Sequence, residues 1–75
     1  MRVTKTSVRK AVIAAFKDIK INQQFSGIEF KRMCVSYAPE LKNKYVDTFL
    51  RLLRYTHHGD YICVNRSSSK YQRIA

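Results

Sequence analysis

The stretch 43–74 constrains the fold of this chain more than any other, because a helical pattern ends there at a single glycine and a hairpin pattern follows. Apolar residues first recur with the i, i+3, i+4, i+7 spacing of a helix that buries one face, at Val46, Phe49, Leu50 and Leu53. Gly59 then supplies the left-handed residue at which helices commonly end. Residues 61–64 and 71–74 are rich in β-branched and aromatic side chains, so the polar segment 65–70 between them predicts a hairpin turn.

The first part of the chain predicts another helix and a short strand. The helix should begin at Thr6 or Ser7, because either residue can cap it. Its buried face has helical spacing and consists of Val8, Ala11, Val12, Ala15, Phe16 and Ile19. Residues 22–25 break this pattern and have the right length for a bend followed by a very short strand.

A second helix is expected from about residue 27 to residue 37. Its start carries a capping-box pattern, with Ser26 as the N-cap and Glu29 at the third helical position. Phe25 and Phe30 occupy the two positions of a hydrophobic staple, which fixes the direction in which the chain enters a helix.

Two starts are open for the third helix. We favour Asn43 as its cap, and the alternative is a start at Pro39 with the proline in the first turn. The face opposite the apolar stripe then carries Lys44, Thr48, Arg51 and Tyr55.

The fifteen lysines and arginines exceed the five acidic residues, which gives a formal net charge of +10. Residues 1–24 carry six basic and one acidic side chain and residues 42–75 carry seven and two, whereas residues 25–41 carry two of each. A charge that only kept the chain in solution would not need to spare its middle. Two basic flanks indicate a surface that faces a polyanion, with a cationic surface of no function as the alternative.

Seventy-five residues allow one domain, 1–75, with a small core and with residues 1–6 as a basic arm. No apolar run approaches the ~20 residues that a membrane helix requires, and the N-terminus lacks the apolar core of a signal peptide. We therefore expect a soluble protein that is cytoplasmic and nucleoid-associated, or that lies inside a host cell.

Neither a metal site nor an active site is expected. Cys34 and Cys63 lack the paired spacing of zinc ligands, so both should be small buried hydrophobes. His57, His58 and Asp60 lie close together, but adjacent histidines point in different directions around a helix end. Because no acid pair, no nucleophile beside a base and no phosphate-binding glycine loop occurs, we expect no enzyme activity and no cofactor.

The order helix, short strand, helix, helix, hairpin resembles the winged helix-turn-helix family of DNA-binding domains over nearly the whole chain. The resemblance rests on residues 25–28 before the second helix, residues 46–53 as the third helix and residues 59–62 before the hairpin. It implies an α+β fold in which the third helix enters the DNA major groove and the C-terminal two-stranded hairpin, the wing, contacts the backbone or minor groove. The connection 38–42 departs from the family, where a tight turn is more usual.

Carried onto this chain, the resemblance implies four DNA contacts on the third helix, at Lys44, Thr48, Arg51 and Tyr55. Arg51 is the best base-reading candidate, because a guanidinium can bond O6 and N7 of guanine together. The alternative for Arg51 is a surface pair with Asp47, four residues earlier. Thr48 and Tyr55 would bond phosphates or touch a thymine methyl. Lys42 and Lys44 would position the helix without reading sequence.

On the wing, the resemblance implicates Arg66 and Lys70. These residues flank three serines, Ser68 at their centre, whose small side chains allow close approach to a DNA backbone. A solvated turn without a function is the alternative. Tyr61 and Tyr71 should pack across the two strands, with stacking on single-stranded bases as the less favoured alternative.

We therefore expect a sequence-specific binder of double-stranded DNA, a transcriptional regulator that represses from an operator of a phage, virus or mobile element. A homodimer would bind an operator more tightly than one module, and Ile13 and Leu52 are candidate apolar contacts between protomers. The alternative is an adaptor or inhibitor that uses the same fold to bind an acidic protein partner. DNA binding would weaken steeply with salt, whereas an adaptor built on an apolar patch would not.

Overall fold

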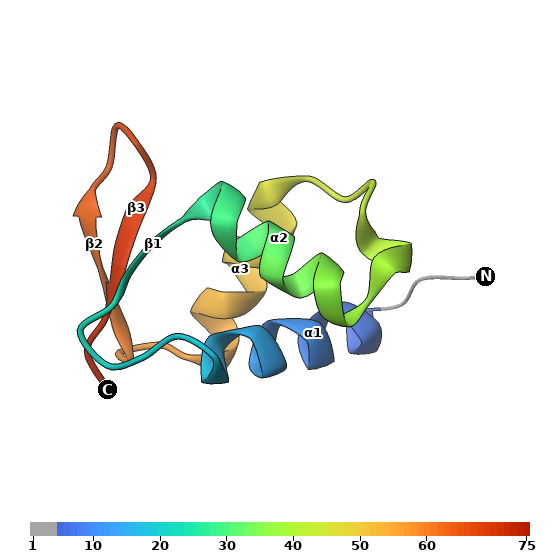
Figure 1. Cartoon of the computed structure of the whole chain (residues 1–75), viewed down its shortest axis with the longest axis horizontal. Helices are drawn as coiled ribbons and strands as arrows, with labels where there is room; N and C mark the ends of the chain where they lie inside the picture. The colour runs from blue at the N-terminus through green and yellow to red at the C-terminus, as the bar shows by residue number, and fades with distance from the viewer. Residues whose placement is uncertain (1–4) are drawn as a thin grey trace.

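The computed structural model describes residues 5–75 as three α-helices, one 3-10 turn and a three-stranded antiparallel sheet (Figure 1). In chain order the elements are α1 (Lys5–Lys17), β1 (Gln24–Ser26), α2 (Gly27–Tyr37), η1 (Pro39–Leu41), α3 (Val46–Thr56), β2 (Tyr61–Asn65) and β3 (Lys70–Arg73). The expected α+β class is confirmed. None of the helices in this part of the chain is long and apolar enough to cross a bilayer.

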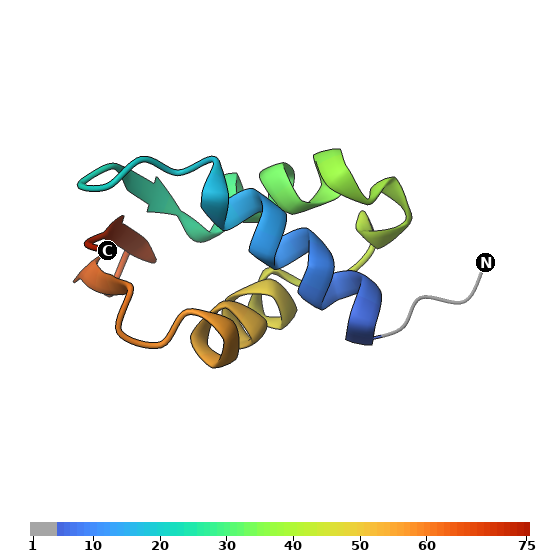
Figure 2. The ribbon, with the colours of Figure 1, turned by 90° about the horizontal axis from the view of Figure 1, so that it is seen from below.

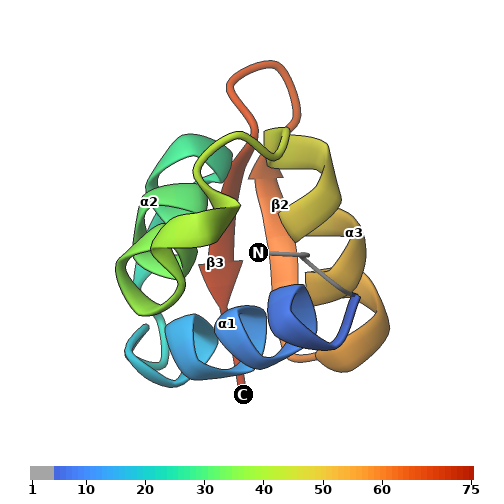
Figure 3. The same ribbon diagram turned by 90° about the vertical axis from the view of Figure 1, so that its right-hand side faces the viewer.

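The sheet closes one end of the helical cluster. Its strand order is β1-β3-β2, so the first strand pairs with the last, and Phe25 lies opposite Tyr71. In Figure 2, α1 runs diagonally between α2, which lies above it, and α3, which lies below it. Figure 3 shows the hairpin behind the helices, with β2 on the α3 side of β3. Packing the helices against one another and against the sheet gives each amphipathic element a surface on which to bury its apolar face.

One apolar core joins all three helices and the first strand. Every residue expected on the buried face of the first helix is buried, and so are Phe49 and Leu53 of α3. Four phenylalanines dominate this core, and each buried ring stabilises the fold by roughly 1.5–3 kcal/mol. The complete cluster is Val8, Ala11, Val12, Ala15, Phe16, Ile19, Phe25, Phe30, Cys34, Leu41, Phe49 and Leu53.

The start of α2 confirms the expected cap. Ser26 Oγ accepts a hydrogen bond from the backbone N–H of Glu29 at 3.1 Å, which satisfies one of the free donors of the first turn. The rings of Phe25 and Phe30 lie with centroids 5.6 Å apart, as the staple requires. The local sequence therefore determined this helix start.

Both expected starts of the third helix are wrong. α3 begins at Val46, and its N-cap is Tyr45, whose side chain makes no capping hydrogen bond. Pro39 begins η1 instead, and Leu41 at the end of η1 is fully buried. The connection has to bring Leu41 into the core before α3 can begin, and that tertiary contact outweighs the local capping preference of Asn43.

The start of the first helix also differs from the expectation. α1 begins at Lys5, so Thr6 and Ser7 lie in its first turn rather than before it. Serine and threonine are tolerated there because the first backbone N–H groups of a helix have no intrahelical acceptor. The expected arm 1–6 is therefore shortened by two residues, and residues 1–4 lie outside the described part of the chain.

The hairpin agrees with the expectation to within a residue at each end. Gly59 has a φ of +87°, which confirms it as the left-handed stop after α3. A register shift between Cys63 and Asn65 marks a β-bulge near the end of β2. The carbonyl of Ser69, in the turn, accepts a hydrogen bond from the N–H of Gly27 at 3.0 Å, so the hairpin tip is fixed against the start of α2.

Candidate functional site

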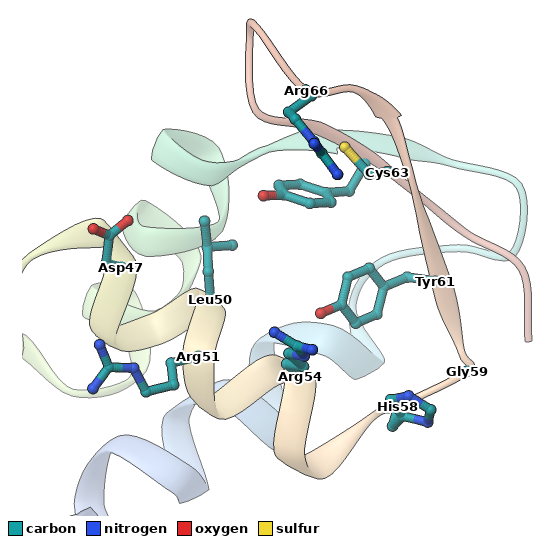
Figure 4. A pocket seen from close by; sticks show the side chains of 10 residues that line it. Asp47, Leu50, Arg51, Arg54, His58, Gly59, Tyr61, Cys63 and Arg66 are labelled. Carbon is teal, nitrogen blue, oxygen red and sulfur yellow. The ribbon is translucent and has the colours of Figure 1, made fainter.

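A groove of about 700 Å³ separates α3 from the hairpin (Figure 4). We call it the α3–hairpin groove, and its lining residues are Asp47, Leu50, Arg51, Arg54, His58, Gly59, Tyr61, Cys63, Arg66 and Tyr71. Three arginines against one aspartate make it cationic. Four apolar or aromatic side chains from α3, β2 and β3 line it between these charges.

The amphipathic pattern of α3 places its arginines on the groove. Phe49 and Leu53 bury one face of the helix, so Arg51 and Arg54 on the other side remain exposed. Asp47 is the expected alternative partner of Arg51, yet the two side chains point in different directions in Figure 4. Both guanidinium groups therefore present their donors at the surface, in a form that matches phosphate or carboxylate oxygens.

The hairpin supplies the opposite wall. Tyr61 and Tyr71 pack edge to face with ring centroids 5.8 Å apart, and Tyr71 also stacks on Phe25 at 5.7 Å. Burial raises the pKa of both hydroxyls, while the Arg54 guanidinium acts in the opposite direction on the pKa of Tyr61. The expected packing of the two tyrosines is confirmed, and both rings also line the groove.

The structure brings only some of the expected DNA contacts together. Arg51 and Arg66 line the groove from opposite sides. Lys42 and Lys44 lie in the connection before α3 rather than on the helix, and Lys44 is half-buried. Because α3 begins at Val46, Lys44 does not lie on the helical face to which it was assigned.

The other expected contacts lie outside the groove. Thr48 is half-buried on α3, whereas Tyr55 is 76% exposed. Ser68 and Lys70 lie exposed in and after the hairpin turn, where the N–H of Ser68 donates to Asn65 Oδ1 at 3.3 Å. These four residues stay predicted DNA contacts, as do Lys42 and Lys44.

Sequence reasoning missed Arg54. Its position three residues after Arg51 places it on a neighbouring part of the same helix surface. The sequence shows this spacing, but it does not show on which side of α3 the hairpin folds. Helical periodicity separates the buried face from the exposed face and does not show which flank of the exposed face a later strand will approach.

The two cysteines differ from each other. Cys34 is fully buried, as expected, and burial raises the pKa of its thiol to about 12. Cys63 is exposed and lines the groove, so its expected burial is wrong. A strand alternates its faces, and only the tertiary structure showed that the face carrying Cys63 borders a groove rather than the core.

His57 ends α3 as a packed side chain. Its ring lies over Phe16 with centroids 4.2 Å apart, and its Nδ1 lies 2.7 Å from Thr56 Oγ1. Burial lowers the pKa of His57, and the nearby Arg73 lowers it further, while Asp60 opposes both. Within residues 5–75, no three side chains of the types that ligate metals form a candidate metal site.

The expected dimer contacts, Ile13 and Leu52, are only partly exposed. Ile13 is half-buried, and Leu52 packs against the core cluster. The large apolar side chains that are exposed lie elsewhere, at Ile21, Ile28, Tyr37, Tyr45, Tyr55, Ile62, Val64 and Ile74. A homodimer through the exposed parts of Ile13 and Leu52 stays a prediction.

Comparison of the chain with protein-family models, with curated proteins and with solved structures found no significant match.

Proposed function

We propose that this chain is a winged helix-turn-helix domain that binds double-stranded DNA with sequence preference and regulates transcription. α3 would enter the major groove, and the hairpin would act as the wing on the flanking backbone. Bound at an operator, the domain would repress by excluding polymerase or an activator. Dimerisation would increase its affinity, because a single small module buries only about 600–1,000 Å² on DNA.

The order of elements supports this proposal. The chain runs α1, β1, α2, α3, β2, β3, which is the order that the resemblance implies, and the hairpin stands beside α3. An α-helix with its side chains is about 10–12 Å wide, which fits a major groove about 12 Å wide. The proposed recognition helix thus has an element next to it that can reach the neighbouring backbone.

One observation carries the proposal: Arg51 and Arg54 of α3 and Arg66 of the hairpin line opposite walls of one groove. Guanidinium groups bind phosphate oxygens through paired hydrogen bonds. We assign Arg51 to base reading, because it lies on the exposed side of α3 directly opposite the buried face. Arg54 and Arg66 are assigned to phosphates on either side of it.

The test is selection from random-sequence duplex DNA, followed by sequencing of the bound fraction, with Arg51→Ala in parallel. We expect an enriched motif in which Arg51→Ala relaxes one position, at a cost of roughly 1–3 kcal/mol for the preferred base. A palindromic motif would indicate a dimer.

Lys17→Ala is the matched control, because it removes the same charge from an exposed position on α1. This variant should select the same motif as the parent. Featureless binding that Arg51→Ala leaves unchanged would contradict the proposed sequence-reading function.

A further inference from the structure

β2 is an edge strand of the sheet. The edge of β2 that does not pair with β3 lies beside the α3–hairpin groove. In the strand order β1-β3-β2, it pairs with β3 alone within the described residues. Figure 3 shows it on the side of β3 nearest α3, and Tyr61 and Cys63 of β2 line the groove. The N–H and C=O groups along such an edge can pair with another strand, which would lie about 4.8 Å away.

The groove is lined by apolar side chains as well as by charged ones. Leu50, Tyr61 and Cys63 give it an apolar surface, and Arg54 and Arg66 project into it from its two walls (Figure 4). Phosphodiesters can use the arginines but offer nothing to the apolar surface or to a strand edge. An extended peptide can use all three.

We propose that the α3–hairpin groove binds an extended acidic segment of a protein partner, which adds to the free edge of β2 as a further strand. Carboxylates on the α3 side of that segment pair with Arg54 and Arg66. Apolar side chains on its other face cover Ile62, which is 48% exposed. The charge complementarity is direct, because Asp47 is the single acid among three arginines in the groove.

The bulge in β2 determines how long the paired segment is. The register shift between Cys63 and Asn65 leaves Tyr61–Cys63 as the regular part of the edge. Bulges discourage pairing between two identical edges, and two copies of this cationic hairpin also repel one another. A short acidic strand is therefore favoured over a second copy of the chain.

Occupancy of the groove has a regulatory consequence. The peptide uses Arg54 and Arg66, to which DNA phosphates were assigned above, so the peptide and DNA exclude each other. This consequence rests on the proposed function, whereas the peptide site itself does not.

The experiment uses the full chain and a fluorescein-labelled peptide of about eight residues with alternating glutamate and valine, followed by fluorescence anisotropy. One control peptide has the same composition with the glutamates and valines in two blocks. A second control is N-methylated at alternate residues, which retains charge and side chains but removes strand pairing. The protein variants are Arg54→Ala, Ile62→Lys and, as the charge control, Lys17→Ala.

We expect the alternating peptide to bind at physiological salt, and both control peptides to bind at least about tenfold more weakly. Arg54→Ala should weaken binding by about tenfold, because it removes a hydrogen-bonded charge pair. Ile62→Lys should weaken peptide binding without weakening binding to duplex DNA, and Lys17→Ala should change neither substantially.

Equal affinity for the N-methylated peptide would overturn the proposal, because charge alone would then explain binding. A dimer in sedimentation that Ile62→Lys dissociates would also overturn it, since a second copy would then occupy the edge. If the unmodified chain binds the alternating peptide but not duplex DNA, the proposed function alone is rejected. If it binds duplex DNA but not the alternating peptide, the peptide site alone is rejected.

Discussion

At the scale of single residues, environment separates side chains of the same type. Cys34 belongs to the core, whereas Cys63 is exposed beside Arg54 and Arg66. The thiolate is the reactive form of cysteine, and burial raises the pKa of Cys34 to about 12. Desolvation and steric protection therefore both suppress the reactivity of Cys34.

We predict that iodoacetamide modifies Cys63 in the native protein near pH 8 and modifies Cys34 only after unfolding. Mass spectrometry of the native protein should show a single fast adduct, which disappears in Cys63→Ser. Two adducts that form at the same rate under native conditions would contradict the buried position of Cys34.

His57 and His58 are adjacent, but His57 is half-buried whereas His58 is exposed. The folded state lowers the pKa of His57 below its ordinary value of 6.5, chiefly because the ring is partly buried against Phe16. The unfolded state therefore binds more protons as the pH falls through this range. Stability contributed by the neutral ring is present above about pH 6.5 and is lost as the pH falls through the lower, folded-state pKa.

We accordingly predict that the midpoint of urea unfolding falls as the pH is lowered from about 7.5 to about 5.5. His57→Gln should reduce this dependence, because the titrating group is removed. His58→Gln, at the neighbouring position, should retain it. An unchanged pH dependence in His57→Gln would exclude His57 as its source.

At the scale of elements, α2 is determined locally. Its N-terminal cap and its hydrophobic staple both join residues fewer than ten positions apart. α3 has an equally clear amphipathic pattern, yet its start follows from Leu41, which has to reach the core. Capping motifs predict a boundary well when the residues before the helix have no tertiary role that competes with them.

We predict that Ser26→Ala destabilises the protein by about 1 kcal/mol, because Glu29 loses the acceptor for its backbone N–H. Ser36→Ala, at an exposed position in the same helix, should be neutral or slightly stabilising, since alanine has the higher helix propensity. Thermal or urea unfolding of the two variants measures the difference. Equal stability of the two variants would show that the Ser26 cap contributes nothing.

At the scale of the whole molecule, folding brings together part of the basic charge of this chain, whose formal net charge is +10. Arg51 and Arg54 are separated from Arg66 by more than ten positions of sequence, and the fold places all three on one groove. Each cation that neutralises a DNA phosphate releases a counterion, so affinity for duplex DNA should fall linearly with salt on a logarithmic plot.

We predict that the double variant Arg54→Ala/Arg66→Ala reduces the magnitude of that salt slope by about 2, because two arginines no longer neutralise phosphates. Lys17→Ala should leave the slope nearly unchanged. Titration of a fixed duplex at several salt concentrations measures both. An equal reduction by Lys17→Ala would indicate that net charge, rather than the groove, determines the affinity.

Local patterns in the sequence were sufficient for the α+β class, for the buried face of α1, for the capped start of α2 and for the stop at Gly59. Helix periodicity, capping and a left-handed glycine involve residues close together in the chain, so the sequence displays them directly. Arg51 and Arg66 were also identifiable as exposed cations from the patterns of their elements.

Only the tertiary structure decided which flank of α3 the hairpin approaches, and hence that Arg54, Tyr61, Cys63 and Tyr71 line one groove. It also decided that α3 begins at Val46 and that the His57 ring packs on Phe16. These features depend on contacts between residues distant in the chain. Their free energies arise from burial of surfaces that meet only after folding, so no local pattern encodes them.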